Sequence, residues 1–400
     1  MIDVRAHLAR KPLLFDGGMG TYYKAKPGTE CEQGNLLDPA GVRKVHREYL
    51  AAGAEAIKTN TFGLPRMAAA RQPDWQALAR AGWKLAAEAA VETGAAVFAD
   101  LGPAPDTEAA PAGSIYTAVA RCFVEQGAKN FLFETLSSDA GVLEAVQAVK
   151  AQVPDAFVLV SFAVLPDGYT REGMYSKDLV RRMTESGIVD AVGFNCVSAP
   201  GAMRTLVQQL GSTALPLSVM PNAGYPVVTR TQVKYQGKPE YFAKELARIA
   251  AEGVRILGGC CGTTPAHIAA LRAALDSLPA VEKAAPAVQV STPEAPTVEK
   301  DDAFLRKLNA GKKVVAIELD SPKDADLTNY LAGAKRLQAA GADLLTIADC
   351  PIARARMDSS LVACRVHREL GLCTLPHMTC RDRNLNATKA LLLGLYAEGV

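Results

Sequence analysis

Two adjacent cysteines, Cys260 and Cys261, stand between glycines directly after an apolar segment. The apolar run Val254–Leu257 predicts a buried strand, whereas Thr264 and Pro265 are typical first residues of a helix. Neighbouring side chains of an extended strand point to opposite faces, so both thiols face one ligand only if the backbone bends. The flanking glycines permit this bend. The segment therefore predicts a strand-to-helix turn that presents two sulfur atoms.

A third cysteine, Cys196, also follows an apolar run, and no histidine lies within metal-ligand spacing of the three. Three thiolates are soft ligands that favour zinc, and a site with three protein ligands keeps one position open for a substrate. Zinc deprotonates a bound thiol, whereas the pKa of a free thiol is about 8.5. The pattern thus predicts activation of a thiol substrate for S-alkylation. A redox pair and ordinary packing of buried cysteines are the alternative interpretations.

The composition excludes several classes of protein. The chain has 400 residues, of which 49% are hydrophobic, and a net charge of +2 without a dense basic block, so we expect no nucleic-acid partner. No apolar run reaches the roughly 18 residues of a membrane span, and the first residues lack a signal-peptide pattern. Nine cysteines in a chain of this length indicate free thiols rather than a disulfide scaffold. We therefore expect a cytoplasmic protein without a membrane partner.

Eight short apolar runs alternate with helical patterns over residues 1–280. Each strand and the helix after it imply a right-handed crossover to a parallel neighbour. Eight such units predict an α/β fold, the closed (β/α)8 TIM barrel, which typically needs about 250 residues. A doubly wound open sheet is the alternative, but no Gly-x-Gly-x-x-Gly turn follows the first strand. The expected strands are Pro12–Phe15, Ala54–Thr59, Ala96–Ala99, Asn130–Phe133, Phe157–Phe162, Ala191–Phe194, Pro216–Met220 and Val254–Leu257. The expected helices include Pro39–Ala52, Trp75–Thr93, Ile115–Gln126, Ala140–Gln152 and Tyr241–Ala251.

The pattern changes after residue 280. Residues 281–300 are rich in proline and lack clear periodicity, so we expect an extended linker. Strands and helices alternate again over residues 301–400, but three units are too few to close a barrel. We therefore expect the incomplete start of a second βα barrel, either cut from a longer protein or packed on the first barrel. Its expected elements are the strands Val314–Leu319, Leu344–Ile347 and Cys373–Pro376 and the helices Leu327–Ala340, Ser359–Glu369 and Ala387–Glu398.

Polar and thiol side chains occupy the carboxyl ends of seven of the first eight expected strands. In barrels of this type the active site forms at that end. The runs before these positions are apolar, so the polarity is confined to the expected mouth. The acids among them have a plainer interpretation as residues that favour the start of the next helix. The residues are Asp16, Asn60, Asp100, Glu134, Cys196, Asn222, Cys260 and Cys261.

Six short segments at these strand ends resemble the homocysteine S-methyltransferase family, and the resemblance covers residues 1–280. It implies a (β/α)8 barrel that binds zinc through three cysteines, which correspond to Cys196, Cys260 and Cys261. It also implies that residues at the barrel mouth hold the amino and carboxylate groups of homocysteine. The corresponding residues are Asp16, Gly17, Gly18, Asn60, Glu134 and Asn222. The segments are Asp16–Thr21, Lys58–Gly63, Phe133–Thr135, Gly193–Cys196, Pro221–Gly224 and Gly258–Pro265.

Residues 301–400 resemble the start of methylenetetrahydrofolate reductase, a flavin-dependent barrel. The resemblance rests on Val315–Lys323 and Leu375–Cys380 and covers only the first strands of that family. It implies that Glu318 is the acid that protonates the folate nitrogen. It further implies that Thr346 and His377 contact FAD.

Together the two resemblances imply zinc-dependent methyl transfer to homocysteine, giving methionine. The donor they imply is 5-methyltetrahydrofolate, the product of the reductase to which the second part is similar. A fragment of a cobalamin-dependent methionine synthase is an alternative, although Glu318 and His377 fit a reductase better than a pterin-binding barrel. An alternative of another class is a non-catalytic zinc protein or thiol redox sensor.

Overall fold

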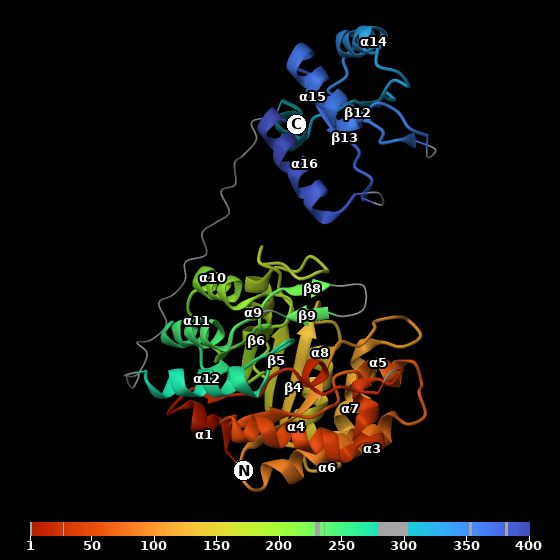
Figure 1. Ribbon diagram of the computed structural model, residues 1–400. Coiled ribbons are helices and arrows are strands. Elements are labelled where there is room, and N and C mark those ends of the chain that lie inside the picture. Colours follow the sequence, from red (N-terminus) through yellow and green to blue (C-terminus); the bar gives the residue numbers. More distant parts are fainter. Residues whose placement is uncertain are drawn as a thin grey trace. The chain divides into compact units, whose positions relative to one another are not determined.

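The computed structural model describes residues 2–26, 28–228, 233–235, 237–278, 303–351, 354–380 and 383–400. They belong to two compact units, Met1–Ser291 and Thr292–Val400, each of which has its own core (Figure 1). The linker expected at residues 281–300 lies outside the described residues. Within the described ranges, every helix is too short or too polar to cross a membrane.

Eight parallel strands form a barrel in the first unit. They are β1 (Leu13–Leu14), β2 (Ala56–Lys58), β3 (Ala96–Leu101), β4 (Asn130–Leu136), β5 (Phe157–Phe162), β6 (Ala191–Asn195), β7 (Leu217–Met220) and β10 (Ile256–Leu257). Hydrogen bonds join them in the order β1-β10-β7-β6-β5-β4-β3-β2. A parallel bridge between Phe15 and Ala56, with a 3.0 Å hydrogen bond from Asp16 N to Ala56 O, joins β1 to β2. The ring is therefore closed, and the expected (β/α)8 barrel is confirmed over the open sheet.

The strands are almost wholly apolar because both of their faces are buried. Leu13 and Phe15 belong to a cluster inside the barrel, whereas Leu14 belongs to the larger cluster between the strands and the helices. Inside the barrel the ring centroids of Phe15 and Phe98 lie 4.7 Å apart. The interior is thus a packed core, and the polar residues at the carboxyl ends of the strands lie on top of it.

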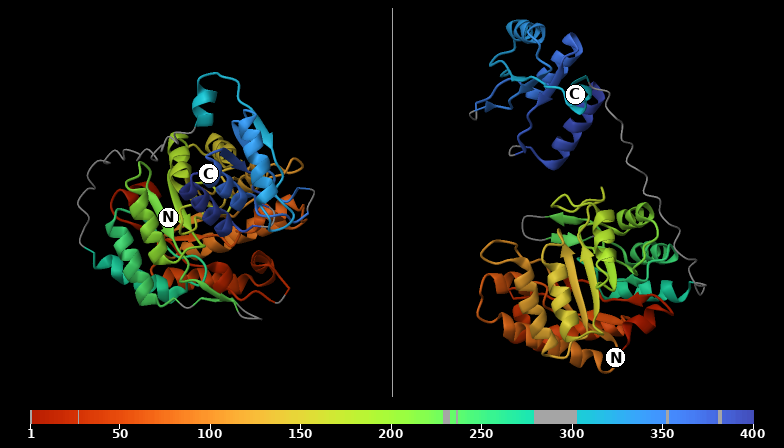
Figure 2. Two further views of the ribbon diagram at one scale, coloured as in Figure 1. Left: turned by 90° about the horizontal axis from the view of Figure 1, so that it is seen from above. Right: turned by 180° about the vertical axis from the view of Figure 1, so that it is seen from behind.

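Helices cover the outside of the barrel (Figure 2). One helix starts after Asp38, whose Oδ1 accepts a 3.0 Å hydrogen bond from Gly41 N, with Pro39 in the first turn. The helices are α1 (Val4–Leu8), α2 (Met19–Tyr22), α3 (Gly34–Leu37), α4 (Pro39–Ala51), α5 (Leu64–Ala69), α6 (Trp75–Ala90), α7 (Ala112–Val124), α8 (Val142–Gln152), α9 (Ser176–Glu185), α10 (Pro200–Leu210), α11 (Pro239–Ala251) and α12 (Pro265–Asp276), with a 3-10 turn at Cys31–Gln33. The five helices named from the sequence are present, with ends displaced by at most a few residues.

An antiparallel hairpin interrupts the alternation between β7 and α11. Its strands are β8 (Pro226–Val228) and β9 (Val233–Tyr235), and the sequence patterns did not predict it. The hairpin brings Tyr235 against the turn that holds the adjacent cysteines. A Cβ atom at Gly262, whose φ is +78°, would lie 2.3 Å from Tyr235 Cβ. Only glycine therefore fits this position of the turn.

The second unit contains a three-stranded parallel sheet in the order β11-β12-β13. Its strands, β11 (Ala316–Glu318), β12 (Leu344–Ile347) and β13 (Cys373–Pro376), agree with the three expected strands. Its helices are α13 (Ala303–Asn309), α14 (Thr328–Ala339), α15 (Ser359–Leu370) and α16 (Leu385–Glu398). Tyr330, Leu345 and Val362 belong to its small hydrophobic core. The unit thus has the strand-helix order of a partial βα barrel.

Candidate metal and substrate site

The three cysteines singled out from the sequence meet at the mouth of the barrel. Cys196 follows β6, and Cys260 and Cys261 follow β10. The three Sγ atoms lie within 4.8 Å of one another, and those of Cys196 and Cys261 are 3.8 Å apart. Cys260 is buried and the other two are half-buried. Such a set leaves one side of the sulfur triangle accessible from the mouth.

Backbone contacts hold the two cysteine-bearing turns together. Cys196 N donates to Met220 O (3.1 Å), and Cys260 N donates to Pro221 O (2.9 Å). Cys196 itself has a φ of +60°, a conformation that costs a non-glycine residue about 1 kcal/mol or more. Asn222 Oδ1 accepts a 3.1 Å hydrogen bond from Cys261 N. The expected site residue Asn222 therefore lies beside the cluster and fixes one of its cysteines.

The cluster fits a zinc ion. It offers three sulfur donors, the soft ligands that zinc favours, without a fourth protein ligand from the metal-binding residue types among the described residues. Hydrogen bonds from Cys196 and Cys260, followed by one from Tyr235, lower the pKa of the Cys261 thiol to about 3. The same sharing of protons raises the pKa of Cys196. Cys196 therefore holds a proton that metal binding would release, whereas Cys261 is already a thiolate at neutral pH.

A cavity of about 330 Å³ opens beside the sulfur atoms. Its wall contains the three cysteines, Gly18–Thr21 from the first strand-to-helix turn, Lys58–Phe62 from the end of β2, and the acids Glu32, Asp100 and Glu134. It is large enough for a small amino acid. The cavity therefore brings a sulfur cluster and several ionisable side chains into one space.

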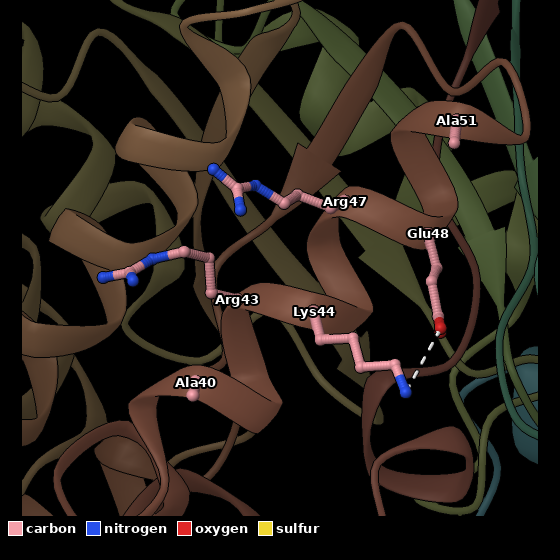
Figure 3. Close-up of a pocket in the computed structure, with 6 residues that line it drawn as sticks. All are labelled: Ala40, Arg43, Lys44, Arg47, Glu48 and Ala51. Carbon is pink, nitrogen blue, oxygen red and sulfur yellow. Dashed lines mark ion pairs between the residues drawn. The ribbon is translucent and has the colours of Figure 1, made fainter.

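A second hollow lies on the outer surface of α4 and is lined by that helix alone (Figure 3). Its charged side chains are paired: Lys44 lies 3.9 Å from Glu48, and Arg43 lies 2.7 Å from Glu88. Such pairs are typical of a solvated helix face. The barrel mouth, rather than this hollow, is the candidate site.

Glu134 and Asp16 lie at the base of the mouth. Glu134 Oε2 is 3.4 Å from Lys58 Nζ, and both side chains are buried. Asp16 Oδ2 accepts a 3.0 Å hydrogen bond from Lys58 N. Burial raises the pKa of Glu134 to about 6 and that of Asp16 to about 7, although Lys58 acts against both shifts. Titratable acids near neutral pH are typical of functional sites.

Asn195 connects the acid to the sulfur cluster, and the sequence analysis did not single it out as a site residue. Its Nδ2 donates to Thr135 Oγ1 (2.7 Å) and Glu134 Oε2 (3.3 Å) and lies 3.9 Å from Cys260 Sγ. Its Oδ1 accepts hydrogen bonds from Thr135 N (2.9 Å) and Ser161 Oγ (2.8 Å). A polar residue at the end of an apolar strand was the signal that could have identified it.

The remaining expected residues take different places. Gly18 lines the cavity, whereas Gly17 packs behind it, where a Cβ atom would lie 2.5 Å from Thr263 Oγ1. Asn60 also lines the cavity, but its amide already donates to Cys31 O (2.8 Å) and Asn35 Oδ1 (2.9 Å). We infer that Asn60 shapes the wall, because its hydrogen-bonding capacity is largely used within the protein.

In the second unit, Glu318, Thr346 and His377 gather at the carboxyl ends of the three strands. Glu318 on β11 is paired in register with Thr346 on β12, and His377 directly follows β13. His377 N donates to Ile347 O at 2.9 Å. The side chains of Glu318 and His377 are exposed and that of Thr346 is half-buried. The three residues therefore share the edge where such sheets bind ligands.

Comparison with protein families yields two matches. The model described as Homocysteine S-methyltransferase matches residues 13–275, and the model described as Methylenetetrahydrofolate reductase matches residues 303–400. The first match contains all three cysteines of the cluster, and the second contains Glu318, Thr346 and His377.

Individual relatives agree with the first match. The chain is 32% identical to the methionine synthase of Mycobacterium tuberculosis over 312 residues, which are 71% of this chain and 26% of that protein. It is 29% identical to the homocysteine S-methyltransferase of Escherichia coli over 296 residues, 65% of this chain and 94% of that protein. The chain thus spans about a quarter of the methionine synthases that it matches.

Solved structures show the same relationship. The crystal structure of the homocysteine methyltransferase MmuM from Escherichia coli, in its oxidized form, matches with a TM-score of 0.56 and 25% identity. The match covers 68% of this chain and 99% of that one. The metallated form of the same enzyme matches with a TM-score of 0.55.

Proposed function

Because the chain belongs to the homocysteine S-methyltransferase family, we propose that its first unit transfers a methyl group to the thiol of homocysteine and thereby forms methionine. The observation that carries this proposal is the cluster of Cys196, Cys260 and Cys261 at the wall of a cavity that also contains Glu134. A soft metal site can bind a thiol substrate, and charged side chains can bind its amino-acid part.

Cys196, Cys260 and Cys261 would hold a zinc ion, which supplies an acidified, deprotonated substrate thiol at neutral pH. Asn222 keeps Cys261 in place through the backbone amide of that residue. Glu134 accepts the substrate ammonium, and Asp16 supports it from below through the backbone of Lys58. Gly17 and Gly18 let the first turn approach the cysteine turn closely, and Asn60 shapes the opposite wall.

The methyl donor that we propose is 5-methyltetrahydrofolate. The new sulfur–carbon bond forms as the bond between the methyl carbon and the folate nitrogen breaks, and that nitrogen takes up a proton. The match of residues 303–400 to a family that handles folates supports this donor. The donor enters through the cavity opening, so that its methyl group meets the sulfur in line with the leaving nitrogen.

For the second unit we propose that residues 301–400 form part of the flavin-binding barrel of a methylenetetrahydrofolate reductase. Thr346 and His377 would contact FAD, and Glu318 would protonate the folate nitrogen. Their common position at the carboxyl ends of β11–β13 supports this assignment. The nine free thiols support a location in the reducing cytoplasm.

The test is a donor screen on the zinc-loaded chain. Homocysteine is mixed with 5-methyltetrahydrofolate, S-methylmethionine, S-adenosylmethionine, betaine or methylcobalamin, and methionine is measured by mass spectrometry. Methionine formed from 5-methyltetrahydrofolate supports both enzyme and donor. No methionine with any donor, from a chain that carries zinc and binds homocysteine, contradicts the proposal.

A second candidate function is that of a fragment of a cobalamin-dependent methionine synthase. The 32% identity to the methionine synthase of Mycobacterium tuberculosis favours it, since this chain matches only 26% of that longer protein. Methionine formed only with methylcobalamin in the donor screen would establish this alternative. A zinc or redox sensor would instead bind no homocysteine in calorimetry.

A further inference from the structure

Lys58 is a buried cation whose hydrogen-bonding capacity is mostly unused. Its side chain is 6% exposed, and it is the only Lys, Arg or His among the described residues that line the cavity. An ammonium group has three donors. In the described part of the chain, Lys58 Nζ has a single hydrogen-bond acceptor, Glu134 Oε2, at the long distance of 3.4 Å.

The groups around Lys58 are acids. Asp16, Asp100 and Glu134 are all buried, and Asp16 Oδ1 and Asp100 Oδ1 lack a hydrogen-bond partner among the described residues. Although burial alone lowers the pKa of Lys58, the carboxylates of Glu134 and Asp16 hold it well above its usual value. The cavity therefore offers several acceptors for an ammonium group and one cation for a carboxylate.

A free amino acid brings both charges into the cavity. Its α-carboxylate must find a cation or backbone donors there, because an unpaired buried charge is costly. The nearby Gly18 N is already used in a 2.9 Å hydrogen bond to Thr263 Oγ1. A substrate carboxylate on Lys58 and a substrate ammonium on Asp100 and Glu134 would instead produce alternating charges around the site.

We propose that Lys58 binds the α-carboxylate of the substrate and so restricts this site to thiols that are amino acids. This assignment rests on the proposed function and identifies the residue that binds the carboxylate of homocysteine. Lysine suits the task, since its flexible stem lets three donors follow the ligand. Lys58 is thus a substrate-binding residue that the sequence analysis did not assign.

The experiment removes the carboxylate and the cation separately. Isothermal titration calorimetry compares homocysteine with 3-aminopropane-1-thiol, which lacks the carboxylate, on the zinc-loaded full chain and its Lys58→Met variant. We expect the native chain to prefer homocysteine by roughly 10- to 100-fold, the range of a hydrogen-bonded charge pair. In Lys58→Met the preference should fall to within about threefold. A purely structural role would weaken both thiols equally and leave their ratio unchanged.

Asp100→Asn is the matched control, because it alters a neighbouring buried charge of opposite sign. It should keep the preference over 3-aminopropane-1-thiol and lose preference over 4-mercaptobutanoate, which lacks the amino group. Zinc content and tryptophan fluorescence verify folding, and Lys58→Gln replaces Lys58→Met if the latter does not fold. An unchanged preference in a folded Lys58 variant overturns the assignment. Absence of homocysteine binding to the native chain overturns the proposed function together with it.

Discussion

The three cysteines differ in what holds them. Cys260 is buried and its amide donates to Pro221 O, whereas Cys196 occupies a strained backbone position. Strained residues persist only where the surrounding structure determines them. The sulfur triangle is therefore a property of the folded barrel rather than of three flexible side chains, and the loss of one thiol cannot be compensated by a neighbour.

The first prediction concerns metal content. Cys260→Ser should reduce bound zinc from about one ion per chain to a small fraction, because two thiolates are too few for a stable site. Mass spectrometry of metal in protein purified without chelators measures the change. The matched control is Cys122→Ser, a buried cysteine of α7 outside the cluster, which should retain its zinc. Equal zinc content in both variants would show that Cys260 is not a zinc ligand.

A second prediction concerns His46, which is fully buried in α4 with neither ring nitrogen hydrogen-bonded in the described structure. Burial lowers its pKa from 6.5 to about 4, so the unfolded chain binds the proton first. The group contributes stability that is present above pH 6.5 and is lost as the pH falls toward 4. The loss is about 3 kcal/mol in the free energy of unfolding.

His46→Leu should abolish this part of the acid sensitivity. Urea titrations at pH 6.5 and pH 4.5 report the first unit alone when followed by tryptophan fluorescence, since Trp75 and Trp83 are the two tryptophans of the chain. The free energy of unfolding of His46→Leu, relative to that of the native chain, should therefore be higher at pH 4.5 than at pH 6.5. A difference that is the same at both values contradicts the burial argument.

At the scale of elements, the turn after β1 and the turn after β10 are fitted to each other. A Cβ atom at Gly18 would lie 2.6 Å from the backbone oxygen of Cys260, whereas a Cβ atom at Gly20 would meet nothing within 4 Å. The two glycines of this short segment therefore differ. Gly18 permits the close contact between the turns, whereas packing does not require a glycine at position 20.

This difference gives the third prediction. Gly18→Ala should displace the cysteine turn and destabilise the first unit by about 1–3 kcal/mol, the usual effect of overpacking, with weaker zinc retention against a chelator. Gly20→Ala lies within α2 and should be neutral or stabilising by about 0.5–1 kcal/mol. Denaturant titration and zinc release rates compare the two. Equal behaviour of both variants would show that the turns do not depend on close contact.

The strands could be predicted because a strand that is buried on both faces is a continuous apolar run. The hairpin β8–β9 could not, since each strand has only three residues and its pairing has no strong local signal. The cysteines and Glu134 were found by residue type at strand ends. Asn195 and Lys58 were not assigned roles, because their importance comes from partners on β4 and in the turn after β10 that only the folded register brings near.

At the scale of the whole molecule, every residue of the proposed methyltransferase site belongs to the first unit. Its barrel is closed by its own strands and has its own core. The fourth prediction is that a chain ending at Ser291 binds zinc and homocysteine as the full chain does, with Kd values within about twofold, because it keeps every residue of the proposed site. Calorimetry on both chains measures this, and a loss of binding on truncation would show that the second unit supports the site.

The second unit contrasts with the first, because the described strands β11 and β13 each pair with only one neighbour. A parallel sheet of three strands exposes two edges, and proteins usually cover such edges. We propose that this sheet is part of a larger barrel, and the match of residues 303–400 to the reductase family supports this. The unit places Glu318, Thr346 and His377 at the carboxyl ends of its three strands.

The contacts of Asn195 predict the order in which the metal and the substrate bind. One amide lies against both Glu134 Oε2 (3.3 Å) and Cys260 Sγ (3.9 Å), so an ion that immobilises the sulfur also immobilises the partner of the carboxylate. Metal loading is therefore expected to prepare the amino-acid pocket before any thiol arrives. The comparison is the affinity for 2-aminobutanoate, which has no sulfur, with and without zinc; equal affinities would contradict this order. A cell short of zinc would then lose recognition of the amino acid as well as activation of its sulfur.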